Sequence, residues 1–198
     1  MSLGHLIAFE GLDQSGKQTQ AERLAAALTE RGRTVEVLSF PDYNTAIGHE
    51  IGRALRGQRE YDADVMQLLY VANRYEYRPR IASTIAAGGV IVCDRYLASS
   101  VAYGEAQGLD PLWLTSVQQY LPQPSLTVLL DIPSDASLQR KQLDRDRYER
   151  DLALLDRVRA SYRRQAESPT WALVDGHKPK EQVTEAVFTE VRTRLGLL

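Results

Sequence analysis

The stretch FEGLDQSGKQTQ, Phe9–Gln20, decides the fold of this chain. Residues 11–18 match the phosphate-loop pattern G-x-x-x-x-G-K-[ST] except at the last place, where Gln18 stands and Thr19 follows one residue late. The apolar run LIAFE (6–10) predicts a buried strand before the loop, and residues 17–31 predict a helix after it. Strand, glycine-rich turn and helix are the context that a phosphate-binding loop requires; the alternative is a glycine-rich turn with a chance lysine.

The residue types of this loop suit a nucleotide triphosphate. Glycine at positions 11 and 16 allows sharp turns that point backbone N–H groups inward, and the N-terminus of the helix adds its dipole. Lys17 would reach the β- and γ-phosphates of a nucleotide. We therefore expect the whole run to bind nucleotide phosphates: Gly11, Leu12, Asp13, Gln14, Ser15, Gly16, Lys17, Gln18 and Thr19.

Gln18 stands where a hydroxyl usually holds Mg²⁺. Its side-chain carbonyl is an acceptable ligand, because Mg²⁺ prefers oxygen, but glutamine is longer than serine. Thr19 is no simple substitute, since one residue turns a helix by about 100°. We expect weaker or differently arranged metal binding rather than none, with Gln18 as a candidate ligand.

Apolar strands alternate with helical patterns along the rest of the chain. Further strands are predicted over 34–40, 90–94, 126–132 and 171–175, and helices over 45–57, 62–87, 111–121, 134–142, 150–167 and 180–195. Strands separated by helices imply an α/β fold with three layers, a parallel sheet between two layers of helices. The length of 198 residues suits one domain over 1–198.

The bulk composition excludes several classes of protein. A net charge of -2 gives no general attraction to nucleic acid or to an anionic membrane. The only cysteine, Cys93, lies in an apolar run, which indicates a core thiol rather than a disulfide or a zinc site. We find no leader pattern and no run long enough to span a membrane, and we expect a cytoplasmic protein.

A second candidate site follows the strand at 90–94. VIVCDRY places Asp94 directly after the apolar residues, where an acidic residue of a phosphate-loop enzyme serves Mg²⁺. The alternative is an aspartate that merely caps the strand end.

Several motifs occur in the order and spacing of one family. They are FEGLDQSGK, FPDY, LLYVANRYE, VIVCDRYLASSVAYGEAQG, LPQPSLTVLLDI, DRYE and LVDG, and they run from about residue 6 to 195. The chain resembles the thymidylate kinases, which transfer a phosphoryl group from ATP to dTMP. The resemblance implies the P-loop NTPase fold, a five-stranded parallel sheet with a mobile lid, and usually a homodimer.

The resemblance implies a thymidine monophosphate site. Tyr70 and Arg74 share one helical face and match residues that the family uses on thymine; from spacing alone, a core aromatic beside a surface arginine is the alternative. Asp13 matches a carboxylate near the sugar 3′-hydroxyl, and Arg95 an arginine on the acceptor phosphate. Ser99, Ser100 and Tyr103 match the lining of the thymine and deoxyribose site, with Tyr103 excluding a ribose 2′-hydroxyl.

The segment FPDY departs from the commonest family form, FPxR. Phe40, Pro41 and Tyr43 match the substrate side, but Tyr43 brings no positive charge where many members have arginine. This puts more weight on Arg95 for holding the phosphate.

Family members differ in where one catalytic cation comes from. Gln14 is uncharged, so we expect the lid to supply it, from QRKQLDRDRYERD (139–151) with the lid over about 140–150. Arg140 and Arg147 fall closest to the lid arginines of the family; a solvated, charged helix face is the alternative.

The sequence thus predicts a Mg²⁺-dependent kinase that transfers the γ-phosphoryl group of ATP to dTMP. Lys17, Asp13, Arg95 and Arg147 are the expected catalytic residues, and Asp94 and Gln18 the expected metal ligands. A deoxynucleoside kinase of related fold is one alternative. A nucleotide-binding protein without phosphoryl transfer is another, motivated by Gln18 and Tyr43.

Overall fold

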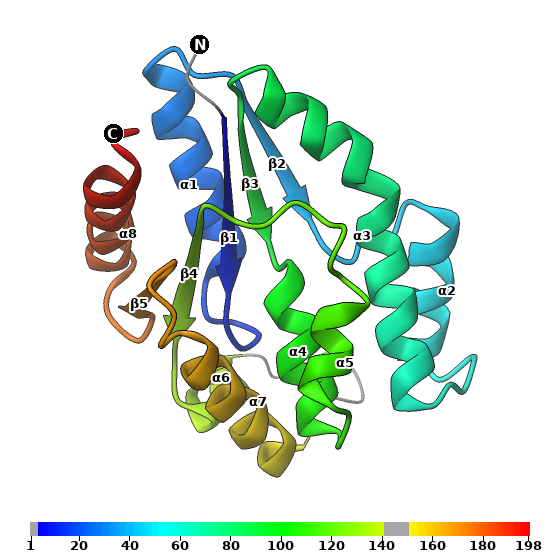
Figure 1. Ribbon diagram of the computed structural model, residues 1–198. Coiled ribbons are helices and arrows are strands. Elements are labelled where there is room, and N and C mark those ends of the chain that lie inside the picture. Colours follow the sequence, from blue (N-terminus) through cyan, green and yellow to red (C-terminus); the bar gives the residue numbers. More distant parts are fainter. Residues whose placement is uncertain (1–3, 141–150) are drawn as a thin grey trace.

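The computed structural model describes residues 4–140 and 151–198 (Figure 1). Its described residues form one parallel sheet of five strands in the order β2-β3-β1-β4-β5. The strands are β1 (His5–Glu10), β2 (Val35–Ser39), β3 (Val90–Asp94), β4 (Leu126–Asp131) and β5 (Trp171–Asp175). The helices are α1 (Lys17–Glu30), α2 (Ala46–Leu55), α3 (Ala63–Ala86), α4 (Leu97–Ala106), α5 (Pro111–Ser116), α6 (Ser134–Arg140), α7 (Leu152–Gln165) and α8 (Lys180–Leu195).

Helices cover both faces of the sheet, as the alternating pattern predicts (Figure 1). Alternate residues of β1 point to opposite faces, so that Ile7 and Phe9 join the core beneath α1 and α8. Leu6 and Ala8 join a second core, beneath α3. The three-layer α/β arrangement is confirmed, and Cys93 is buried in the sheet as expected.

The sheet register brings the sequence motifs together at one edge. Phe9 pairs with Asp94 across β1 and β3, and Glu10 pairs with Leu129 across β1 and β4. Because all strands are parallel, their carboxyl ends lie at the same edge, where ligands of open α/β sheets bind. The loop after β1 and the turn after β3 are therefore neighbours.

The periodic pattern did not predict helix α4, which the structure contains. Six of its ten residues are buried, and they are small: Ala98, Ser99, Ser100, Ala102, Gly104 and Ala106. A helix that packs on several sides lacks the polar stripe on which a periodic pattern depends.

The helix predicted over 111–121 is shorter than expected and ends at Ser116. Beyond it the backbone N–H groups of Gln118, Gln119 and Leu121 each donate to a carbonyl three residues earlier. These bonds form successive turns rather than an α-helix. The prediction of the far boundary was therefore wrong.

Candidate active site

The loop between β1 and α1 has the backbone of an anion-binding turn. Gly11 has a φ of 140°, and a Cβ there would lie 2.5 Å from the Leu130 carbonyl oxygen, so only glycine fits. Gly16, with a φ of 93°, precedes α1, whose N-terminus opens into the loop. Gln14 also adopts a left-handed conformation, at a φ of 61°. Backbone N–H groups at a helix N-terminus in this setting bind phosphate.

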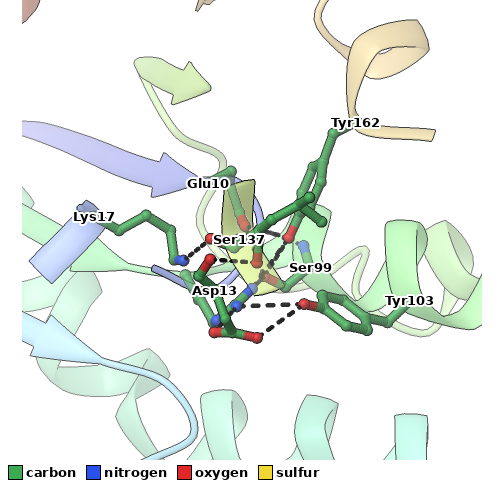
Figure 2. Close-up of polar contacts among 9 residues, drawn as sticks. Glu10, Asp13, Lys17, Ser99, Tyr103, Ser137 and Tyr162 are labelled. Atoms are coloured by element: carbon green, nitrogen blue, oxygen red, sulfur yellow. Dashed lines mark hydrogen bonds and ion pairs between the residues drawn. The ribbon is translucent and has the colours of Figure 1, made fainter. Parts of the chain in front are cut away.

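Lys17 is buried within this loop. Its Nζ atom donates a hydrogen bond of 2.8 Å to the Leu12 carbonyl oxygen (Figure 2). Burial, together with the nearby positive charge of Arg95, lowers the pKa of Lys17 to about 8. The ammonium therefore lies on the inside of the loop and is easily deprotonated.

Asp13 and Arg95 form the charged centre of the site. The Arg95 Nη2 atom lies 2.5 Å from the Asp13 carboxylate, and the Tyr103 hydroxyl donates to the same carboxylate at 3.2 Å (Figure 2). Burial alone would raise the pKa of Asp13, but the charges of Arg95 and Lys17 outweigh it and hold this pKa well below its usual range. Asp13 is therefore a carboxylate at any ordinary pH.

The backbone fixes the position of Arg95. The residue has a left-handed φ of 65° in the turn between β3 and α4, and its N–H donates to the Phe9 carbonyl oxygen at 2.9 Å. Its Nη1 atom donates to the Ser99 hydroxyl at 3.1 Å and to the Tyr162 hydroxyl at 3.3 Å. A non-glycine residue in this conformation is uncommon and is often found at functional sites.

A cavity opens beside this pair, and sequence-predicted residues make up most of its lining. It is lined by Asp13, Phe40, Pro41, Tyr43, Tyr70, Arg74, Arg95, Ser99, Ser100 and Tyr103, together with Leu55 and Gln67. The aromatic rings supply a surface on which a planar base can stack, and the arginines supply positive charge. Every residue predicted on the substrate side therefore borders one cavity.

Arg74 lies in the wall of this cavity, within α3. Its Nη2 atom donates to the Ser100 hydroxyl at 2.5 Å and to the Gln118 side-chain oxygen at 3.0 Å. Its Nε–H has no hydrogen-bond partner among the described residues. Burial lowers the pKa of Arg74 to about 10, so the guanidinium stays charged at neutral pH. A buried donor without a partner suits a carbonyl oxygen of a bound base.

Asn73 holds the loop that carries Tyr43. Its side-chain oxygen accepts from the Asp42 N–H at 2.8 Å, and its amide nitrogen donates to the Asp42 carbonyl at 3.2 Å and to the Thr45 hydroxyl at 2.9 Å. The loop contains a cis peptide bond between Phe40 and Pro41. The asparagine of the ANR motif thus fixes loop geometry, while the arginine beside it lines the cavity.

The two expected metal ligands, Asp94 and Gln18, differ in their surroundings. The Oδ1 atom of Asp94 is buried and has no hydrogen-bond partner among the described residues, which fits a carboxylate that binds a cation or its water. The buried Ser15 hydroxyl also has no hydrogen-bond partner among the described residues. The amide nitrogen of Gln18 donates to the exposed Glu22 carboxylate at 2.9 Å. In the described ranges, no group of three or more His, Cys, Asp or Glu residues could hold a metal by itself.

The predicted lid falls largely outside the described residues. Arg147 and the rest of 141–150 lie there, and although Arg140 ends α6, its side chain is also outside them. Helix α6, which precedes this segment, contacts the phosphate-binding loop: the Ser137 hydroxyl donates to the Asp13 carbonyl oxygen at 2.7 Å.

Sequence reasoning missed several residues that hold or line the site. Tyr162 and Gln118 bond the two arginines, Gln67 lines the cavity, and Glu10 accepts hydrogen bonds from Ser99 and Tyr162. Glu10 carried a signal, since it is a carboxylate at the end of an apolar strand. The others lie in helices and turns without a motif.

The fold and site define an ATP-dependent phosphoryl-transfer protein of the phosphate-loop class. The family model for thymidylate kinase matches residues 9–187. This chain therefore belongs to the thymidylate kinase family. It is similar to the thymidylate kinase of Schizosaccharomyces pombe, 35% identical over 81% of this chain and 76% of the relative. The human thymidylate kinase is 32% identical over 93% of this chain and 88% of its own length.

A solved structure agrees with this assignment. The thymidylate kinase of Candida albicans superposes with a TM-score of 0.85 at 29% sequence identity, covering 100% of this chain and 96% of the other. The predicted family and fold are thus confirmed. No helix in the described part of the chain is long and apolar enough to cross a membrane.

Proposed function

We propose that this protein transfers the γ-phosphoryl group of ATP to dTMP, giving ADP and dTDP. One observation carries the proposal: the cavity lined by Arg74 and Tyr70 opens directly onto the Asp13–Arg95 pair at the phosphate-binding loop. A dTMP molecule with its base in the cavity would have its 5′-phosphate beside Arg95 and within reach of the phosphate-binding loop. Positioning of this kind, with fixed cations, is most of what phosphoryl transfer requires.

Each residue then has a chemical task. The loop N–H groups and Lys17 hold the donor phosphates, and Arg95 holds the acceptor phosphate. Tyr70 stacks on thymine, Arg74 and Ser100 bond the base, and Phe40, Pro41, Tyr43 and Ser99 complete the wall. Tyr103 closes the space beside the sugar, and Asp13 accepts a hydrogen bond from its 3′-hydroxyl. This last contact places the sugar, and no proton is transferred. In the transition state Lys17 and Arg95 stabilise charge from opposite sides.

Magnesium fits the donor side of this arrangement. Asp94 would hold the ion directly or through water, because its Oδ1 atom lacks another partner among the described residues. Gln18 bonds Glu22 through its amide nitrogen, so its side-chain oxygen would be the ligand. When bound with ATP, Mg²⁺ would neutralise part of the negative charge of the phosphates.

The remaining expectations form part of the same proposal. The chain acts as a single domain over 1–198 with a lid at about 140–150, whose Arg140 and Arg147 supply cations near the transferred group. We also propose a cytoplasmic homodimer. Large apolar side chains stay exposed on α3 and α5, including Leu68 and Leu112, and a second copy would cover them. Sedimentation of the purified protein tests the dimer.

The deciding experiment is an ADP-release assay with ATP, dTMP and varied Mg²⁺, with dTDP confirmed by mass. Magnesium-dependent dTDP formation is the expected result. Thymidine in place of dTMP is the control for a deoxynucleoside kinase, and its turnover without that of dTMP would overturn the proposal. Intact ATP binding with no product at high protein concentration would indicate a nucleotide-binding protein instead.

A further inference from the structure

Glu10 is a buried carboxylate that has no direct role in the proposed binding and transfer of phosphate. It is the last residue of β1 and is fully buried. Its Oε1 atom accepts from the backbone N–H groups of Tyr96 at 2.8 Å and Ser99 at 3.3 Å. Its Oε2 atom accepts from the Ser99 hydroxyl at 2.6 Å and the Tyr162 hydroxyl at 3.1 Å (Figure 2). A buried charge is costly unless it is bonded in this way, so its retention calls for a reason.

The count of protons sets the direction of these bonds. A serine or tyrosine hydroxyl has one proton to donate, and a carboxylate has none. Burial and the charge of Glu10 raise the pKa of Tyr162, so its hydroxyl keeps its proton. The Ser99 and Tyr162 oxygens also lie 2.9 Å apart, and either hydroxyl can donate to the other. In each arrangement both protons stay among these two oxygens and Glu10, so each hydroxyl oxygen keeps a lone pair for another donor.

Those lone pairs face Arg95. Its Nη1 atom donates to Ser99 at 3.1 Å and to Tyr162 at 3.3 Å. Its Nη2 atom serves the other side, toward Asp13 and Tyr103. Nη1 is therefore bonded to two hydroxyls that Glu10 also contacts, while Nη2 is bonded to Asp13 and Tyr103, which line the cavity.

We propose that Glu10 is a positioning residue for Arg95, which acts by turning the Ser99 and Tyr162 hydroxyls into paired acceptors for the guanidinium. The inference rests on the proposed role of Arg95 in binding the phosphate of dTMP. The Nη1 edge stays anchored while a phosphate engages the rest of the guanidinium, so the arginine is in place before the substrate arrives.

Glu10→Gln tests this with almost no change of shape. The glutamine oxygen takes the place of Oε1, because two backbone N–H groups point there. Its amide nitrogen, a donor, then replaces Oε2, and both hydroxyls must accept from it. One of their protons can bond the other hydroxyl, but the second then turns toward Arg95 and opposes its donors. We expect the KM for dTMP to rise about tenfold to a hundredfold, and the KM for ATP to change less than about twofold.

A double-mutant cycle separates orientation from simple loss of contact. Tyr162→Phe alone should raise the KM for dTMP about fivefold, because one acceptor for Arg95 is lost. In the Glu10→Gln background the same change should cost far less, since the hydroxyl no longer serves Arg95. Tyr120→Phe, at an exposed tyrosine outside the site, is the matched control and should leave both KM values unchanged.

Outcomes against the proposal are distinct. The proposal would be overturned if Glu10→Gln changed the KM values for ATP and dTMP equally or left both unchanged. It would also be overturned if the effects of the two substitutions on the KM for dTMP were additive. If Glu10→Gln does not fold, as judged by circular dichroism, Tyr162→Phe against Tyr120→Phe decides by the same split between dTMP and ATP.

A readout independent of turnover keeps the inference apart from the proposed function. The side-chain NMR signal of Arg95, assigned by Arg95→Lys, should be sharp and slowly exchanging in the free wild type and broadened in Glu10→Gln. If the wild type formed no dTDP, the proposed function would fail while this comparison still tested the positioning. An Arg95 signal that is identical in both proteins would contradict the positioning of Arg95 by Glu10.

Discussion

Binding of ATP should take up a proton, because the free protein holds Lys17 with a pKa of about 8. Bound phosphates favour the charged ammonium and raise its pKa, so each neutral Lys17 gains a proton as ATP binds. From that pKa, the neutral fraction is about 0.1 at pH 7, about 0.5 at pH 8 and about 0.9 at pH 9.

These fractions fix the size of the effect. The proton uptake per ATP should follow them, and the Kd for ATP should rise about fivefold from pH 8 to pH 9. The sign is set by the depressed pKa: affinity is full below pH 8 and falls as the pH rises through that value. The last phosphate ionisation lies near pH 6, so ATP itself contributes little at pH 9.

Titration calorimetry in two buffers of different ionisation enthalpy measures the uptake directly. Lys17→Arg is the control, because guanidinium stays charged beyond pH 12 and should remove the uptake at pH 9. An uptake below about 0.2 at pH 9 in the wild type would refute the reasoning, since Lys17 would then be charged already in the free protein.

Three further predictions concern other parts of the site. Gln18→Ser should tighten the apparent Mg²⁺ dependence with equal or higher turnover, measured by ADP release; a clear loss would mean that Gln18 is itself a ligand. Tyr103→Ala should relax discrimination against the ribose analogue of dTMP, and an unchanged ratio of kcat/KM values would count against that role. Asn73→Ala should lower the free energy of unfolding in urea by about 1–3 kcal/mol, because the partly buried Asp42 N–H loses its acceptor and the Asp42 carbonyl keeps only its longer bond from Thr45; a loss under about 0.5 kcal/mol would contradict this.

The sequence predicted the positions of the strands and most of the residues that line the site. Each strand is an apolar run with clear ends, and a parallel sheet then places Asp13 and Asp94 at one edge. The residues on the substrate side were found through motifs whose members are close in sequence, such as Tyr70 with Arg74.

The sequence did not reveal what holds those residues in place. Tyr162 meets Arg95 across 67 positions, and Gln118 meets Arg74 across 44. Such contacts depend on how α7 and the turns after α5 pack, and periodicity does not predict which partner a segment will meet. Helix α4 was missed for a related reason, since burial on several sides removes its polar stripe.

The ion pair between Asp13 and Arg95 means that the site carries its own counter-ion for the arginine. A bare anion such as inorganic phosphate would have to compete with Asp13 and would leave that carboxylate beside a second negative charge. A nucleotide that brings a sugar hydroxyl offers Asp13 a new hydrogen bond as its phosphate engages Arg95. Selection in this site is therefore an exchange of partners, which favours ligands that satisfy both ends at once and disfavours phosphate alone.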